Sequence, residues 1–182
     1  MAVRNADETL RQEAARKEIH AALPLLLPRL RRFCRGLAGS LDGGDDLCQE
    51  AIARALAGAG GFERGSRLDR WIFRIARNIQ IDSGRRRRTR GEEVDVDYAE
   101  STAGDDGRQV TEARSDLARV RSGFRDLPED QRMLMLLVVV EGFSYKDAAE
   151  TLEIPLGTVM SRLSRARKAL DRCLHGGAKL EA

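Results

Sequence analysis

The hydrophobic periodicity of the chain stops at one stretch near its middle, residues 89–110. It holds seven acidic residues and three glycines and has few large apolar side chains. Such a composition buries too little apolar surface to hold one conformation, so we predict a flexible acidic linker. The segments on either side, 10–88 and 111–174, both show apolar residues at helical spacing. The sequence therefore predicts an all-α protein of two small helical domains.

The positions of the charged residues along the chain are more informative than the net charge. Lys and Arg total 32 against 29 acidic residues, which leaves a net charge of +3. The arginines, however, gather in three clusters: Arg29–Arg35, Arg64–Arg77 and Arg85–Arg90. Basic clusters indicate either a polyanionic partner or a solvated face, and the sequence leaves both open.

Several classes of protein are disfavoured. Cys34, Cys48 and Cys173 lie far apart and show no zinc-ligand spacing, so we expect reduced thiols and neither metal nor cofactor. Residues 1–9 lack the layout of a signal peptide. The longest apolar run, Met133–Val140, is too short to span a bilayer. We therefore expect a cytoplasmic protein without membrane insertion.

Three helices are predicted in the first block: 10–38, Asp45–Ala57 and Leu68–Asp82. We expect breaks in the first of them at Pro24 and Pro28. A turn is expected over Gly39–Gly44, and Gly84 with the arginines after it is expected to end the block.

The second block begins with a predicted helix over Thr111–Phe124. Leu127-Pro128-Glu129 indicates the start of the next helix, with Pro128 in its first turn, where the missing N–H costs nothing. Met133–Val140 is apolar on nearly every side, which predicts a central helix, and Gly142 is expected to end it.

The sharpest local pattern lies between Ser144 and Leu170. Ser144 can cap a helix, with Asp147 three residues later as in a capping box. Glu153–Pro155 forms a turn, and Pro155 can start a second helix. That helix has an apolar face, made by Val159, Leu163, Ala166 and Leu170. The pattern predicts a helix-turn-helix.

The opposite face of the second helix carries polar and basic residues: Thr158, Ser161, Arg162, Arg165 and Lys168. A helix that enters the major groove needs short polar side chains near its N-terminus and arginines for bases or phosphates. The alternative is an ordinary amphipathic helix pair with a solvated basic face.

Several motifs together resemble one family. SYKDAAE at Ser144–Glu150 and GTVMSRLSRAR at Gly157–Arg167 resemble the promoter-recognition helix-turn-helix of extracytoplasmic-function (ECF) sigma factors, and LPEDQR at Leu127–Arg132 resembles the start of the same domain. DLCQE at Asp46–Glu50 is similar to the family's polymerase-binding helix, and LDRWIFRIARN at Leu68–Asn78 to its promoter-melting segment. The motifs follow the family's order and spacing over nearly the whole chain.

The resemblance implies a transcription initiation factor with three interfaces. The first, on the clamp helices of the largest polymerase subunit, comprises Asp46, Gln49, Glu50 and Arg54. The second, on the minus-ten element, comprises Phe62, Arg67, Arg74, Ile75, Arg77 and Asn78, with Trp71 expected in the core. The third, on the minus-thirty-five element, is the polar face from Thr158 to Lys168. The polymerase flap, promoter DNA and a regulatory anti-sigma factor are the other expected partners.

Some features and alternatives temper this interpretation. Met160 stands where members often carry Lys or Arg, which is a departure from the family's pattern. The short segment after Leu170 argues against the family's extra ligand-sensing domain, and the chain lacks room for the larger N-terminal region of housekeeping sigma factors. A helix-turn-helix repressor or activator, a nucleic-acid enzyme such as a recombinase, and a sigma-like decoy are the competing functions. No nucleophile–base pair or carboxylate cluster favours an enzyme.

Overall fold

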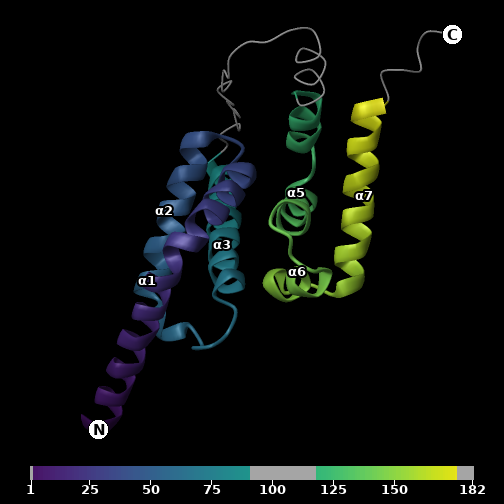
Figure 1. Ribbon diagram of the computed structural model, residues 1–182. Helices are drawn as coiled ribbons and strands as arrows, with labels where there is room; N and C mark the ends of the chain where they lie inside the picture. Colours follow the sequence, from purple (N-terminus) through teal and green to yellow (C-terminus); the bar gives the residue numbers. More distant parts are fainter. Residues whose placement is uncertain (1, 91–117, 176–182) are drawn as a thin grey trace, which may run out of the picture. The chain divides into compact units, whose positions relative to one another are not determined.

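The computed structural model describes residues 2–90 and 118–175. The chain divides into two units, Met1–Tyr98 and Ala99–Ala182. Figure 1 shows helices and no strand in the described parts of both units. The prediction of an all-α fold with two helical domains is therefore confirmed. The predicted linker lies outside the described residues except for Thr89 and Arg90, which are helical.

The N-terminal unit is built from α1 (Ala2–Ala38), α2 (Leu41–Ala57) and α3 (Leu68–Arg90), with a short 3₁₀ turn, η1, over Ala59–Gly61. Helix α1 packs along α2 and also contacts α3. Their shared core includes Phe33 of α1 and Phe73 of α3, whose ring centroids are 4.8 Å apart. Both rings are fully buried.

The predicted breaks at Pro24 and Pro28 are wrong, because α1 runs through both residues. Both prolines are exposed and stand four residues apart, so they share the solvent side of the helix. The carbonyl groups that lose a helical partner lie on that same side, where water can bond to them. The buried side of α1, with Leu30 and Phe33, continues past the prolines.

Two glycine signals were also misinterpreted. The predicted turn over Gly39–Gly44 is only two residues long, because α2 begins at Leu41 and Ser40 caps it by accepting a hydrogen bond from the Gly43 N–H at 3.2 Å. Gly44 serves close packing instead, since a Cβ there would lie 2.4 Å from the Cα of Arg35. Likewise, Gly84 lies inside α3 and does not end it.

The C-terminal unit contains α5 (Glu129–Met135), α6 (Tyr145–Leu152) and α7 (Leu156–His175). Residues 118–125 are helical, whereas 111–117 of the predicted first helix lie outside the described residues. Pro128 occupies the N-cap of α5, one residue earlier than predicted. Helix α7 packs on α5 and on α6.

The apolar run Met133–Val140 is buried only in its first part. Met133 to Leu137 are buried, but Val139 and Val140 are exposed. The backbone changes to a π-helical turn, η2, over Leu136–Val140, and Gly142 follows with φ of 72°. The predicted central helix is therefore buried over Met133–Leu137 but not in its last turn, and the predicted stop at Gly142 is confirmed.

Candidate interfaces for protein and nucleic acid

One side of α2 presents a polar stripe, made by Asp46, Gln49, Glu50 and Arg54. All four residues are exposed, and their spacing places them on one side of the helix. Glu50 and Arg54 form an ion pair with 2.6 Å between the carboxylate oxygen and the guanidinium nitrogen. The opposite side, with Leu47 and Ala51, is buried in the core. The four predicted polymerase-binding residues therefore lie together on one solvent-exposed side of α2.

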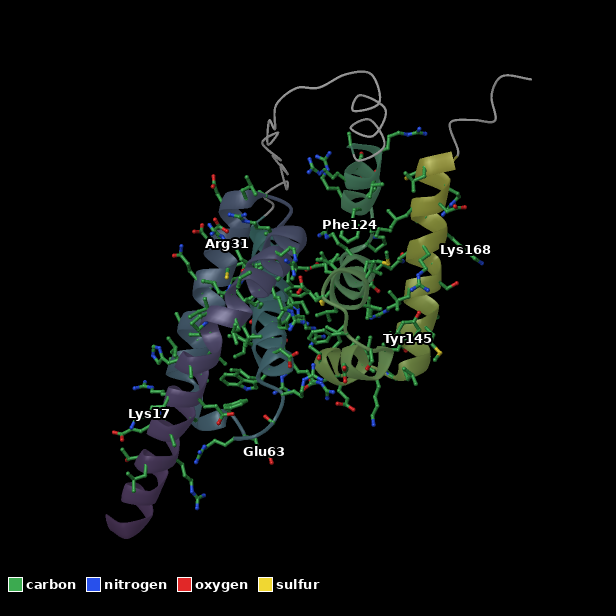
Figure 2. All side chains as sticks on the ribbon, in the orientation of Figure 1. Lys17, Arg31, Glu63, Phe124, Tyr145 and Lys168 are labelled. Atoms are coloured by element: carbon green, nitrogen blue, oxygen red, sulfur yellow. The ribbon has the colours of Figure 1, made fainter. Side chains whose placement is uncertain are left out.

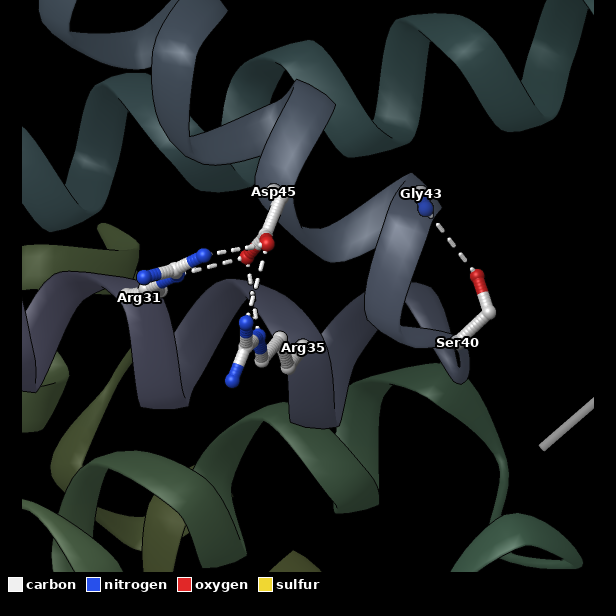
Figure 3. A network of polar contacts seen from close by, with 5 residues as sticks. All are labelled: Arg31, Arg35, Ser40, Gly43 and Asp45. Atoms are coloured by element: carbon white, nitrogen blue, oxygen red, sulfur yellow. Dashed lines mark hydrogen bonds and ion pairs between the residues drawn. The ribbon is translucent and has the colours of Figure 1, made fainter. Parts of the chain in front are cut away.

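Asp45, next to this stripe, faces inward toward α1. Figure 3 shows its carboxylate accepting paired hydrogen bonds from Arg31 and from Arg35. The two Nε–O distances are both 2.8 Å. Hydrogen bonds from the two guanidinium groups hold the pKa of Asp45 well below its usual range. Two arginines of the first basic cluster thus have a partner inside the protein, and this clamp fixes the position of α2 on α1.

The outer side of α3 carries Trp71, Arg74, Ile75 and Asn78, which follow one another at helical spacing. Asn78 is exposed, and the other three are half-buried. Arg77 lies at the edge of this side and donates a hydrogen bond to the amide oxygen of Asn78 over 3.3 Å. Three of the predicted minus-ten residues therefore lie on one face with the Trp71 ring. Arg77, a fourth, borders this face through its hydrogen bond to Asn78.

The two aromatic residues of this region differ from the expectation in how far each is buried. Phe62 is 5% exposed and belongs to the core around Ile19, whereas Trp71 is half-buried at its edge. Their ring centroids are 5.2 Å apart. Phe62 follows η1, whose 3₁₀ turn directs it inward, so it offers little surface to a base. Sequence periodicity did not reveal this, because Phe62 lies in a loop.

Arg67 precedes α3 and is held by Asp69. It donates two hydrogen bonds to the carboxylate, at 2.9 and 2.7 Å. Burial raises the pKa of Asp69, but hydrogen bonds from Arg67 and from the Arg70 N–H outweigh that effect and leave the pKa below its ordinary value. One edge of the Arg67 guanidinium is therefore occupied within the protein.

The helix-turn-helix has the predicted local chemistry. Ser144 accepts a hydrogen bond from the Asp147 N–H at 3.0 Å and so caps α6. Glu153 makes the turn in the left-handed conformation, with φ of 54°. Arg167 of α7 donates to the hydroxyl of Tyr145 on α6 over 3.2 Å, which ties the two helices together. Figure 2 shows Lys168 projecting from α7 on the side away from α6.

The surface of α7 is centred differently from the prediction. Ser161, Arg165 and Lys168 are exposed and share it with Ser164, which the sequence interpretation missed. Thr158 is half-buried at one edge. Arg162 reaches toward α5 and forms an ion pair with Asp130, at 2.9 Å. A helical wheel centred opposite Val159, Leu163 and Ala166 includes Ser164 and leaves Arg162 at its edge, so the sequence held the signal for both.

Other chemistry is sparse in residues 2–90 and 118–175. No group of His, Cys, Asp and Glu there could hold a metal ion. The cysteines are free, Cys34 and Cys48 being buried and Cys173 exposed. No helix within the described ranges combines the length and the hydropathy that a membrane span needs.

Comparisons with known proteins agree on one family. Residues 25–90 match the family model "Sigma-70 region 2", and residues 117–170 match "Sigma-70, region 4". The chain is 38% identical, over 90% of its length and 86% of the relative, to the ECF RNA polymerase sigma factor EcfG of Rhodopseudomonas palustris. It is 36% identical to the RNA polymerase sigma-H factor of Pseudomonas aeruginosa over 71% of this chain and 72% of that protein.

Two solved structures resemble the fold. The sigma factor RpoE in complex with the anti-sigma factor NepR, from Bartonella quintana, aligns with a TM-score of 0.73 and 32% identity over 91% of this chain and 99% of that one. CnrH in complex with the cytosolic domain of CnrY aligns with a TM-score of 0.67 over 95% of this chain and 99% of that one. At 24% identity, the second supports the fold alone.

Proposed function

The chain belongs to the ECF family of RNA polymerase sigma factors, and from this premise we propose how its surfaces share the work of transcription initiation. A protein of this family binds core RNA polymerase and directs it to specific promoters. It acts in the cytoplasm, where polymerase and DNA are, and contributes binding surfaces rather than a catalytic group. The observation that carries the proposal is the presence of both sigma regions, in order, on one chain.

We assign core-polymerase binding to the exposed stripe of α2. Asp46 and Glu50 present carboxylates that suit a basic partner, and Gln49 and Arg54 complete the surface with hydrogen-bonding groups. The Asp45 clamp supports this assignment, because it fixes the helix that carries the stripe and leaves the stripe itself exposed. Partner binding then needs no rearrangement of α2.

We assign reading of the minus-ten element to the outer side of α3. An unpaired base needs a hydrogen-bonding group and an apolar surface to lie against. Asn78 offers the first, and Ile75 with the half-buried ring of Trp71 offers the second. Arg74 and Arg77 lie beside them as cations for phosphates. Burial of Phe62 favours Trp71 as the flat wall.

We assign reading of the minus-thirty-five element to the exposed side of α7. Ser161 and Ser164 supply short polar groups, and Arg165 and Lys168 supply positive charge. We further propose that an anti-sigma factor holds the protein inactive. The similarity to a sigma factor solved with the anti-sigma factor NepR supports this, because the alignment covers 91% of the chain.

The decisive experiment is transcription in vitro with purified core polymerase and a library of promoters. We expect initiation from a defined promoter class only when the protein is added. Asp46→Lys with Glu50→Lys should abolish co-purification with core polymerase while the helical content is retained. Glu13→Lys, a charge reversal at one exposed acid of α1 outside the stripe, is the control and should bind as the wild type does.

A gel-shift titration separates the main alternative. The free protein should bind promoter duplex weakly at physiological salt, since one recognition helix makes few phosphate contacts. Tight, sequence-specific binding without polymerase would instead favour a helix-turn-helix repressor or activator.

A further inference from the structure

Met160 is an exposed apolar residue on a largely polar surface, with Leu156, also exposed, one turn before it on α7. It lies near the N-terminal end of α7, and half of its surface, 50%, is exposed. Ser161 is adjacent, and Ser164 lies one turn further along the same side. A thioether left in water at this point gains nothing for the fold, since the buried side of α7 is filled by Val159 and Leu163.

The surroundings of Met160 indicate which partner covers it. The exposed side of α7 carries Arg165, Lys168 and Arg172, which are cations suited to phosphates. At Gly157 a Cβ would meet nothing within 4 Å, so the backbone beside Met160 is open to close approach. The surface therefore fits a polyanion with an apolar spot on it. In the major groove of DNA that spot is the C5-methyl group of thymine.

We propose that Met160 contacts the methyl group of one thymine in the minus-thirty-five element and so sets base preference at that position. The proposal rests on the sigma-factor function assigned above. A methionine suits this contact because its unbranched side chain adapts its shape to the base edge. Burial of one methyl-sized group corresponds to about a fourfold change in affinity.

The test removes the methyl group alone. Each thymine of the element is replaced in turn by deoxyuridine, and binding of the polymerase holoenzyme to each duplex is measured. The wild type should lose about fourfold in affinity at one replacement. Met160→Ala should bind the unmodified promoter less tightly and should no longer respond at that position. Met160→Leu, which keeps an apolar side chain, should retain the response. Val139→Ala, a change at an exposed apolar residue outside α7, serves as the control and should respond as the wild type does.

The outcomes distinguish the Met160 contact from the sigma-factor function. An active holoenzyme whose deoxyuridine response is the same in Met160→Ala overturns the Met160 assignment and leaves the sigma-factor function standing. A wild type that responds at no thymine overturns the assignment in the same way. Failure of the wild type to support any promoter-dependent initiation would contradict the function itself. Helical content of each variant, measured by circular dichroism, confirms that an exposed substitution leaves α7 folded.

Discussion

The Nε atom of Arg162, on α7, lies 2.9 Å from a carboxylate oxygen of Asp130 in the first turn of α5. The two side chains are 30% and 44% exposed, so the pair stands at the edge of the protein rather than in its core. Arg162 therefore joins two helices of the C-terminal unit. Arg165, on the exposed side of α7, donates a hydrogen bond to the Ser161 carbonyl of the same helix.

This difference predicts separate effects for the two arginines. Arg162→Ala should lower the free energy of unfolding of the C-terminal unit by about 0.5–1 kcal/mol, the range of a partly exposed ion pair. Arg165→Ala should leave stability unchanged and weaken holoenzyme binding to all promoters alike, with a flatter salt dependence. Urea unfolding and salt titrations measure the two effects. A double-mutant cycle with Asp130→Asn checks the pair, and zero coupling energy would contradict it.

Gly44 and Gly84 should respond in opposite directions to alanine. A Cβ at position 44 would lie 2.4 Å from the Arg35 Cα and 2.7 Å from the Arg35 backbone nitrogen, so α1 and α2 must move apart. We expect Gly44→Ala to cost about 1–3 kcal/mol. Gly84→Ala meets open space inside α3 and should stabilise by up to about 1 kcal/mol. Thermal unfolding of both variants tests this, and equal melting temperatures would argue against it.

Asp45 makes stability depend on pH in the acid range. Its pKa is lowered by the hydrogen bonds from Arg31 and Arg35, whereas in the unfolded chain it is about 3.9. The stabilisation is therefore fully present above the unfolded pKa and is lost as pH falls from there through the folded pKa. Asp45→Asn should be less stable than the wild type at pH 7, and the difference should shrink below about pH 4.

Denaturant titrations at a series of pH values measure this difference. Asp46→Asn removes an equal charge from the next position of α2, which is exposed, and serves as the control. A gap between wild type and Asp45→Asn that stays constant from pH 7 down to pH 3 would disprove the clamp.

Helices could be predicted from the sequence wherever apolar residues recur at helical spacing over several turns, as in α2, α3 and α7. The errors concern residues whose role depends on a neighbouring helix. Pro24 and Pro28 fit inside α1 because both face solvent, and Gly44 signals the close approach of α1 rather than a turn. Local sequence cannot show which side of a helix is covered.

The site residues also divide into those placed by a single helix and those whose environment comes from another segment. Helical spacing was enough to group the α2 stripe and the outer side of α3, because each lies on one regular helix. The ion pair of Arg162 and the burial of Phe62 were not predicted, because their environments come from α5 and from α1. Ion pairs between distant segments, such as Arg31 with Asp45, leave no periodic signal in the sequence.

The last prediction distinguishes base reading from phosphate binding on α3. Asn78 is exposed and presents an amide, which can donate and accept hydrogen bonds with one base, whereas Arg77 beside it carries only donors and charge. Asn78→Ala should therefore lose discrimination at one position of the minus-ten element, and Arg77→Ala should weaken all sequences about equally. Initiation by the holoenzyme is measured on a set of promoters that vary one base at a time. Because Arg77 donates to the Asn78 amide oxygen, its loss also frees that amide, so Arg74→Ala is measured beside it as a second arginine of the same face. An Asn78→Ala holoenzyme with the full wild-type preference would rule out base reading by this residue.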